Sequence, residues 1–133
     1  MRRIAYFLPL SALLLALLQT ANGGQNVQAT YFLNVTFQCD NGITTPGYSV
    51  YVVGDKPEIG SWDPANAVLL KPSAYPKWTG RVKFSNVKLG DQVKWKCVIR
   101  NENTPYDVQK WQPGADNQVT LAWSPEPQSI GTF

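Results

Sequence analysis

Two tryptophans lie in turn sequence, which is an unusual place for a residue that belongs to a core. Trp62 sits in the segment "GSWDP", and Trp111 runs directly into "QPG"; Gly, Pro, Ser and Asp are turn residues. A flat exposed indole stacks on the C–H face of a pyranose, whose hydroxyl groups then need amide or amine partners. The alternative is that each indole covers a loop at the edge of the core. The occurrence of two such residues with polar neighbours favours a binding site.

Lys96 and Asn117 are the candidates for hydrogen bonds to sugar hydroxyls. Lys96 projects away from the apolar parity of residues 92–100, "QVKWKCVIR", and its ammonium group has three donors. Asn117, in "GADNQ", offers both donors and acceptors. Lysines on an outward strand face are usually only solvated, and asparagine is a common turn residue. The two residues therefore support a sugar site only in combination with the indoles.

The sequence lacks components of most catalytic centres. It contains no histidine, so a nucleophile activated by imidazole and the usual zinc sites each lack a component. Glycoside hydrolysis needs only two carboxylates, and the candidates are Glu58, Asp63, Asp107, Asp116 and Glu126. Most of these acids lie in turns, where they cap and solvate the chain. We therefore expect a protein that is not an enzyme and that holds neither a cofactor nor a metal.

Short alternating segments rich in Val, Tyr, Phe and Trp must position these side chains. They occur at residues 31–39, 49–53, 67–70, 78–84, 92–100, 108–111 and 118–123. Turn sequences such as "DNG" and "LGD" separate them, and residues 24–133 show no sustained 3.6-residue apolar spacing of the kind a helix needs. About seven strands at this spacing predict an all-β fold, an immunoglobulin-like antiparallel β-sandwich or open barrel.

Strand parity sorts the five tryptophans into two groups. Residues two apart in a strand share a face, and the apolar faces of their segments then contain Trp78, Trp95 and Trp123. These three are expected in the core. Trp111 has the parity opposite Val108, and Trp62 lies outside the strand segments, so both are expected at the surface.

Cys39 and Cys97 are the only cysteines. An even pair in an exported chain favours a disulfide. Each cysteine lies on the apolar parity of its segment, Cys39 with Phe37 and Cys97 with Trp95. A bridge between them would join two strands inside the sandwich.

The first residues have the order of a secretory signal peptide. Arg2 and Arg3 precede an apolar run at residues 4–18, and small residues follow it. The run is shorter than the roughly 20 residues of a membrane span, although an uncleaved anchor is the alternative. We expect cleavage of residues 1–23 and a secreted β-domain at residues 24–133, which is extracellular, or periplasmic in a Gram-negative source.

The charge of the mature chain gives little support for a nucleic-acid or membrane partner. The whole sequence has 12 Lys and Arg against 9 Asp and Glu, a net charge of +3. Loss of Arg2 and Arg3 with the signal peptide lowers this to +1. A strongly basic surface is the footprint of nucleic-acid and anionic-membrane binding, so we expect no nucleic acid and, after cleavage, no membrane among the partners.

Four segments of the chain resemble the starch-binding domains known as carbohydrate-binding module family 20. "SVYVVGDKPEIGSWDPANAVLL", "YPKWTGRV", "VKWKCVIRN" and "VQKWQPGADNQ" match the segments of that family in order, with Ile59 at the position of its usual leucine. "FQCDNG" and "WKCVIRNEN" are similar to the version at the C-terminus of bacterial maltooligosaccharide-forming amylases. The resemblance covers nearly the whole mature chain and implies a sandwich-like β-domain with two starch sites.

The resemblance also implies which residues form these two sites. The first site, with two stacking tryptophans, a lysine and an asparagine, falls on Trp62, Trp111, Lys96 and Asn117. The gap between the last tryptophan and the asparagine is one residue longer than in fungal members. In the second site one family tyrosine falls on Tyr75, while its partner position holds Pro46 and Tyr48 is the nearby substitute.

The function implied by the resemblance is noncatalytic binding of starch-type α-1,4-glucans by a secreted, free-standing module. The expected ligands are starch, amylose, maltooligosaccharides and glycogen, and a separately encoded amylase is an expected partner. Two alternatives stay open on the sequence alone. One is a secreted protein-interaction domain that uses the exposed aromatic residues, and the other is a small enzyme acting on polysaccharide.

Overall fold

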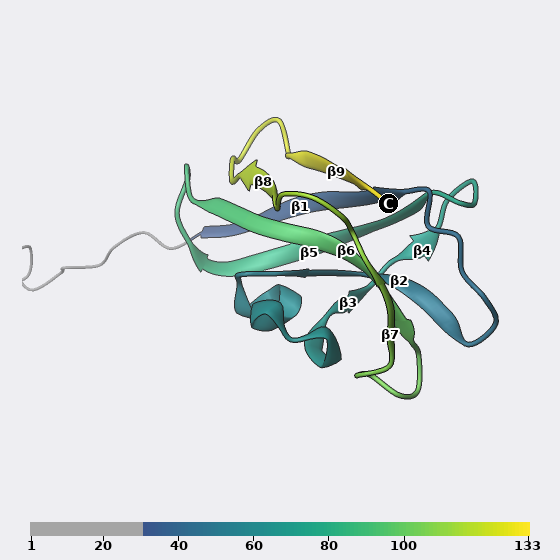
Figure 1. Cartoon of the computed structure of the whole chain (residues 1–133). Helices are drawn as coiled ribbons and strands as arrows, with labels where there is room; N and C mark the ends of the chain where they lie inside the picture. The colour runs from purple at the N-terminus through teal and green to yellow at the C-terminus, as the bar shows by residue number, and fades with distance from the viewer. Residues whose placement is uncertain (1–30) are drawn as a thin grey trace, which may run out of the picture.

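Residues 31–133, which the computed structural model describes, form two β-sheets packed face to face (Figure 1). This confirms the predicted all-β sandwich. The predicted signal peptide, residues 1–23, and the predicted start of the mature domain at residue 24 lie outside the described residues. Within residues 31–133, no helix has the length and apolar character needed to cross a membrane.

The first sheet has the strand order β4-β5-β1-β9. Its strands are β1 (Tyr31–Asp40), β4 (Lys71–Pro72), β5 (Trp78–Val87) and β9 (Gln128–Thr132). β1 is antiparallel to β5 and parallel to β9. The inward positions of β9 are occupied by Ser129 and Gly131, neither of which provides an apolar side chain. Hydrophobic alternation therefore does not mark this strand, and the sequence analysis missed it.

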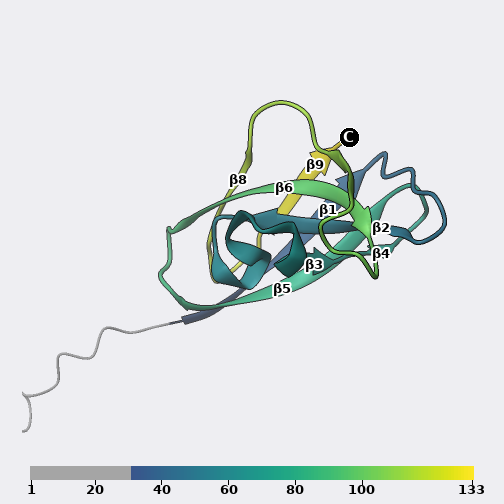
Figure 2. The same ribbon diagram turned by 60° about the horizontal axis from the view of Figure 1, so that its bottom comes forward.

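The second sheet has the order β3-β2-β6-β7, and β8 also pairs with β6. Its strands are β2 (Tyr48–Gly54), β3 (Val68–Leu69), β6 (Gln92–Asn101), β7 (Val108–Trp111) and β8 (Asn117–Thr120). Two short 3-10 turns, η1 (Pro57–Trp62) and η2 (Pro64–Asn66), connect β2 to β3 and lie against this sheet (Figure 2). Only Leu70, which is buried, separates β3 from β4, so the chain passes from one sheet to the other at this residue.

Alternating apolar residues of the long strands fill the space between the sheets. Trp95 is completely buried, and its ring lies edge-on to Phe37 with 4.8 Å between centroids. Its indole N–H donates to Ser129 Oγ at 2.9 Å, so the buried polar atom is satisfied. Trp78 is also buried, and its N–H donates to the carbonyl oxygen of Gly42 at 2.8 Å. The prediction that Trp78 and Trp95 belong to the core is confirmed.

Trp123 is not part of the core, and this prediction is wrong. β8 ends at Thr120, and Trp123 lies in the following loop with 66% of its surface exposed. Val119 and Leu121 are buried, as the alternation predicts. Side chains alternate between two faces only while the chain remains a strand. The prediction for Trp123 assumes that the alternation continues beyond the end of β8 at Thr120. It therefore places Trp123 in the core instead of at the surface.

A β-bulge in β7 changes the direction of Trp111. Val98 of β6 pairs with Trp111, whereas Arg100, two residues further along β6, pairs with Val108, three residues back along β7. The extra residue turns Val108 and Trp111 to the same face, and the predicted opposite parity of these two residues is wrong. Bulges commonly re-aim side chains in this way.

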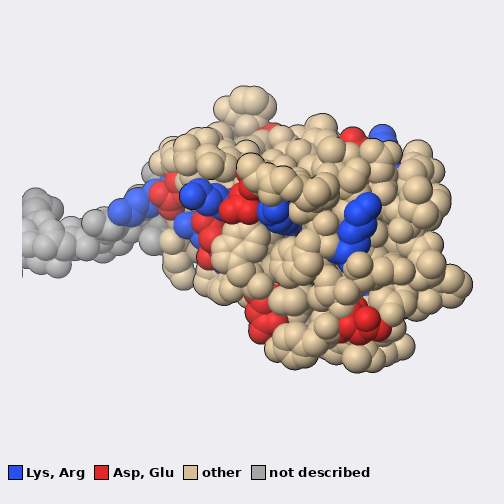
Figure 3. Space-filling model, viewed as in Figure 1, with Lys and Arg blue, Asp and Glu red and all other residues tan. Residues whose placement is uncertain are grey.

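Charged side chains of both signs are interspersed on the face shown in Figure 3, and most of that face is uncharged. No single-sign patch dominates it. Opposite charges that lie close together largely cancel each other's field at a distance.

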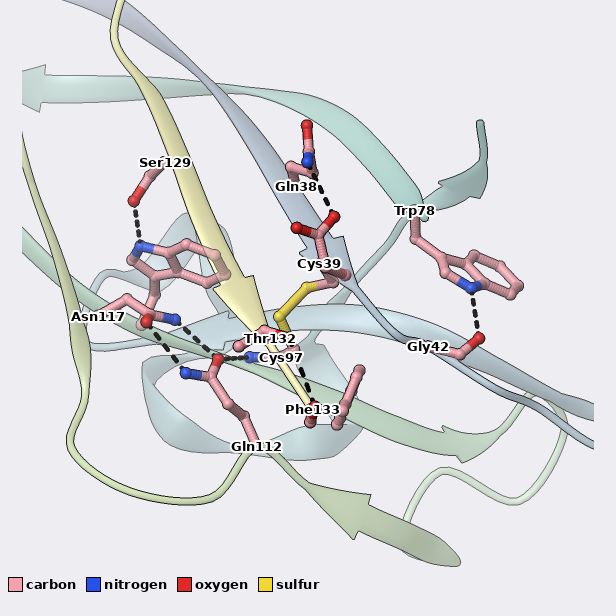
Figure 4. Close-up of a disulfide and its surroundings, with 12 residues drawn as sticks. Gln38, Cys39, Gly42, Trp78, Cys97, Gln112, Asn117, Ser129, Thr132 and Phe133 are labelled. Carbon is pink, nitrogen blue, oxygen red and sulfur yellow. Dashed lines mark hydrogen bonds between the residues drawn. A yellow bond between two sulfur atoms is a disulfide. The ribbon is translucent and has the colours of Figure 1, made fainter. Parts of the chain in front are cut away.

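A disulfide joins the two sheets through Cys39 of β1 and Cys97 of β6 (Figure 4). Both cysteines are completely buried, and their Cα atoms are 6.0 Å apart, a usual separation for a disulfide. The predicted bridge is confirmed. Because its ends are separated by 58 positions in the sequence, it closes a long loop of the chain.

Replacing both cysteines, Cys39→Ser with Cys97→Ser, should lower the free energy of unfolding. A link with a sequence separation of 58 restricts the unfolded chain. On the loop-entropy model, removing it lowers the free energy of unfolding by about 4 kcal/mol. Denaturant unfolding of the parent and the double variant, followed by tryptophan fluorescence, measures the difference. A loss below about 1 kcal/mol would contradict the structural importance given to the bridge.

Candidate functional site

The outer face of the second sheet carries a small apolar cluster of its own. Tyr51, Val53 and Val98, here called the outer cluster, point away from the main core and are nevertheless buried. Tyr51 pairs with Val98, which in turn pairs with Trp111. Directly paired residues of antiparallel strands share a face, so Tyr51, Val98 and Trp111 form one row across the sheet. Trp111, on the edge strand, is 40% exposed.

Trp62 covers the outer cluster from the η1 turn. Its side chain is half-buried and packs against the cluster, as do Ala67 and Val108. Part of the indole therefore contacts protein, and the remainder faces solvent. Trp62 and Trp111, the two predicted platforms, thus lie on the same face of the second sheet, as the predicted binding surface requires.

The backbone that presents Trp62 has an unusual conformation. Three consecutive residues are left-handed, with φ of +89° at Gly60, +49° at Ser61 and +65° at Trp62. For residues other than glycine this region costs about 1 to 2 kcal/mol. Gly60 also has no room for a side chain, because a Cβ there would lie 2.8 Å from the backbone carbonyl of Asn66. Strained backbone of this kind clusters at functional sites.

Asp63 fixes this turn and connects it to the loop between β6 and β7. Its Oδ1 accepts a hydrogen bond from the N–H of Ala65 at 2.9 Å and so caps η2. Its Oδ2 accepts one from the hydroxyl of Tyr106 at 3.3 Å. The negative charge of Asp63, followed by this hydrogen bond, raises the pKa of the Tyr106 phenol, which remains a neutral donor.

Tyr106 is a residue that the sequence analysis did not single out. It is 71% exposed and is held beside the Trp62 turn by its hydrogen bond to Asp63. The signal was present in the sequence, because "NTPYD" places an aromatic ring among turn residues just as "GSWDP" does. Its closeness to Trp62 depends on the tertiary structure.

Arg100 holds Tyr51 in place within the outer face. Its guanidinium carbon lies 3.8 Å from the centroid of the Tyr51 ring, and the Arg100 side chain is buried. Such a contact between a cation and an aromatic face is favourable. Burial raises the pKa of the Tyr51 phenol, and the positive charge of Arg100 opposes this effect. Tyr51 thus forms a fixed, uncharged part of the floor beneath Trp62.

Lys96 lies on the same face of β6 as Val98, two residues away. Its ammonium group donates to the carbonyl oxygen of Gln112 at 3.1 Å and to that of Gly114, and it lies 4.0 Å from Asp116 Oδ1. The side chain is only 17% exposed. Because two of its three N–H groups bind carbonyls, Lys96 braces the loop that leaves Trp111.

Asn117 is half-buried and forms an amide pair with Gln112 (Figure 4). Asn117 Nδ2 donates to Gln112 Oε1 at 2.7 Å, and Gln112 Nε2 donates to Asn117 Oδ1 at 3.0 Å. Gln112 Oε1 also accepts from the N–H of Cys97 at 3.0 Å. A Cβ at Gly131 would come within 2.6 Å of both amides, so only glycine fits there. The pair therefore ties the loop after Trp111 to β6 and β8.

The two tyrosines assigned to a second site differ in exposure. Tyr75 is 53% exposed, and its hydroxyl accepts a hydrogen bond from the N–H of Thr44 at 3.0 Å. Tyr48 is half-buried against the main core and donates its hydroxyl proton to Asp107. This hydrogen bond is the main reason why the pKa of Tyr48 is raised. The Tyr75 ring is exposed enough to stack on a ligand. The Tyr48 ring packs against the core, and its hydroxyl already binds Asp107.

Four of the five acidic residues considered for catalysis have structural partners. Asp63 binds Ala65, Asp107 binds Tyr48, Asp116 lies near Lys96, and Glu126 binds Arg81. In the described part of the chain, His, Cys, Asp and Glu do not gather in groups of three that could hold a metal. The outer face therefore offers stacking surfaces and hydrogen bonds rather than a nucleophile with its base.

Comparison with known proteins shows which family this chain resembles. A family model described as a starch-binding domain matches residues 32–129. A glucan 1,4-alpha-maltotetraohydrolase of Roseateles saccharophilus is 45% identical over 101 residues, which are 75% of this chain and 18% of that protein. A cyclomaltodextrin glucanotransferase of Klebsiella oxytoca is 41% identical over 85 residues, which are 64% of this chain and 12% of that protein.

One solved structure corresponds to the domain alone. The family 20 carbohydrate-binding module of a maltotetraose-forming amylase from Pseudomonas saccharophila has a TM-score of 0.68 and 44% identity. The alignment covers 76% of this chain and 100% of that one. This chain spans less than a fifth of the length of the two enzymes above, so the likeness concerns a noncatalytic module. The chain belongs to the starch-binding domain family, carbohydrate-binding module family 20.

Proposed function

We propose that this chain is a secreted, free-standing module that holds starch-type α-1,4-glucan on the outer face of its second sheet. The observation that supports this most is that Trp62 and Trp111 lie on one face, both anchored and both partly exposed. An indole with one side in contact with protein keeps its position while the other side stacks on a glucose ring. A pair of such rings contacts separate glucose units of one chain.

The polar groups near each platform are proposed to bind the sugar hydroxyls. The Tyr106 hydroxyl lies beside the Trp62 turn, and the Lys96 ammonium lies beside the loop after Trp111. Asn117 pairs with Trp95 and so shares its inward face; its amide, bonded to Gln112, holds that loop from the inside. The platforms are open, so few ligand atoms are buried, and we expect a Kd roughly in the micromolar to millimolar range. A granule presents many chains at once, which raises the overall strength of adsorption.

The proposed ligands are starch, amylose and maltooligosaccharides, together with glycogen, because all contain the α-1,4 linkage. A separately encoded amylase acting on the same granule is the proposed partner. Tyr75 is proposed as a weaker, second contact for the glucan, since its ring is exposed but Tyr48 is occupied by Asp107.

Trp62→Ala and Trp111→Ala should each reduce adsorption to starch granules at least about tenfold, because each removes one stacking surface worth roughly 1.4 kcal/mol or more. Pull-down on insoluble starch measures the effect, with cellulose as the control polysaccharide. Thermal unfolding should show that both variants remain folded.

Trp95→Ala is the contrasting change, since it empties a completely buried site and should cost about 3 to 5 kcal/mol of stability. Leu89→Ala, which removes an exposed apolar side chain outside the outer face, is the control for binding. Equal losses of stability in all three tryptophan variants, or unchanged adsorption in Trp62→Ala and Trp111→Ala, would contradict the proposed site.

Lys96→Met should weaken binding of β-cyclodextrin by about tenfold. Methionine keeps an unbranched stem but cannot donate to the carbonyls of Gln112 and Gly114, so the loop after Trp111 loses its brace. Titration followed by tryptophan fluorescence measures the affinity. Lys94→Met is the matched control, because Lys94 shares the parity of Lys96 and is exposed. Equal effects of the two substitutions would argue against a role for Lys96.

The protein recovered from the culture medium should have the mass of residues 24–133 with one disulfide. The bridge between the sheets supports export, because disulfides persist in oxidising compartments. Intact mass spectrometry before and after reduction makes the measurement. Retention inside the cell as a reduced chain, or recovery only as part of a larger polypeptide, would contradict the secreted, free-standing form.

A further inference from the structure

A second pair of exposed aromatic rings lies outside the site described above. Phe32 of β1 and Trp123 of the loop between β8 and β9 are 59% and 66% exposed. Both line one groove with a volume of about 200 Å³. The polar part of its lining consists of Asn34, Arg81 and Glu126. Exposed aromatic surface with a polar rim is typical of a binding site.

The sheet itself places these residues on its outer face. Along β1, Leu33 is buried, and Phe32 and Asn34 on either side of it point outward. Arg81 of β5 pairs with Thr36 of β1, further along the same face. The N–H of Thr36 also donates to the carbonyl oxygen of Pro127 at 3.0 Å, which fixes the loop that carries Trp123 against β1.

The polar lining is organised for hydrogen bonding and carries no net charge. Arg81 donates to Glu126 through Nε at 3.0 Å and 3.2 Å and through Nη2 at 2.7 Å. A pair held by two nitrogens has a defined geometry, and it leaves the other guanidinium nitrogen and carboxylate lone pairs for a ligand. The half-buried Asn34 side chain makes no hydrogen bond to another described residue, and its amide offers both donors and acceptors.

A lysine lies over one face of the Phe32 ring. Lys83 of β5 places its ammonium nitrogen 4.4 Å from the centroid of that ring, a distance at which a cation is attracted to an aromatic face. Phe32 is therefore less mobile than an isolated exposed side chain, and a ligand that stacks on it loses less side-chain entropy.

The groove is separate from both sites implied by the family. Trp62 and Trp111 lie over the second sheet, whereas Phe32 and Arg81 lie on the first. Tyr75 precedes β5 and is bonded to Thr44, just after the end of β1, whereas Phe32 lies at the start of that strand. The groove thus belongs to a different face from one site and to a different end of the sandwich from the other.

We propose that this groove binds a glucose unit of a second α-1,4-glucan chain, an inference that rests on the proposed function. Rings at its border suit the C–H faces of a sugar, and Asn34 with the Arg81–Glu126 pair suits its hydroxyls. A charged ligand would have to compete with the partner that Arg81 or Glu126 already has. A protein partner needs about 800 Å² of contact on each side, far more than this groove supplies.

Sugar contacts on opposite faces allow one module to hold two glucan chains. Each contact is weak, because an open groove buries few ligand atoms. Simultaneous contact with neighbouring chains raises the overall strength of adsorption without any new tight site. The groove therefore matters more on a granule, where chains are crowded, than for a short oligosaccharide in solution.

The test follows the indole N–H signals of the five tryptophans in heteronuclear NMR spectra of the full mature chain, assigned by single Trp→Phe substitutions. Maltoheptaose is added to the parent and to a double variant, Trp62→Ala with Trp111→Ala. We expect the Trp123 signal to shift in both proteins with a Kd on the order of 1 to 10 mM. The signals of buried Trp78 and Trp95 serve as internal controls.

The outcomes separate this inference from the proposed function. In the parent protein, a shift of the Trp62 and Trp111 signals without a shift of the Trp123 signal means that the groove binds no glucan. The inference alone is then wrong. If, in the parent protein, the Trp123 signal shifts and the Trp62 and Trp111 signals do not, the inference holds and the proposed site on the second sheet is wrong. If Trp123 responds equally to polyethylene glycol at the same concentration, it reports a general solvent effect and the inference is overturned.

A polar substitution tests the rest of the groove. Asn34→Ala should weaken the Trp123 response at least about threefold and leave the Trp62 response unchanged, because the two lie on opposite sheets. Lys88→Ala, at an exposed cation outside the groove, is the control. Dispersed spectra of each variant show that it is folded, so an unchanged Trp123 response in Asn34→Ala would contradict the assigned lining.

Discussion

The outer face of the second sheet has to be covered, and yet its cover has to remain open to a ligand. Tyr51, Val53 and Val98 would expose a continuous apolar surface if nothing packed on them. Trp62 meets both conditions, since part of its indole buries the outer cluster and the rest faces solvent. The left-handed backbone from Gly60 to Trp62 is the local cost of holding the ring there.

The same face is connected to the interior through a chain of polar contacts. Lys96 and Gln112 brace the loop after Trp111, and Gln112 also binds the N–H of Cys97. Cys97 is bridged to the opposite sheet through Cys39. The edge strand that carries Trp111 is therefore tied to the disulfide-bonded core, which limits the entropy that the platform loses when a sugar binds.

Much of the fold follows from alternation in the sequence, and its failures have physical causes. The inward positions of β1, β5 and β6 are apolar and were predicted correctly, with both cysteines among them. β9 was missed because its inward positions are Ser129 and Gly131, chosen for a hydrogen bond to Trp95 and for space beside Asn117. These requirements come from neighbours far away in the sequence.

The sequence by itself determined the apolar inward positions of β1, β5 and β6, that the cysteines lie among them, and that two indoles lie in turns. These properties depend on side-chain type and on spacing within a strand. Only the tertiary structure decided that Trp62 and Trp111 share a face, that Trp123 lies in the loop after β8 outside the core, and that Tyr106 reaches the Trp62 turn. These placements depend on the bulge in β7, the packing of η1 on the outer cluster, the end of β8 and a hydrogen bond between two loops. All of them involve residues far apart in the sequence, which local spacing does not reveal.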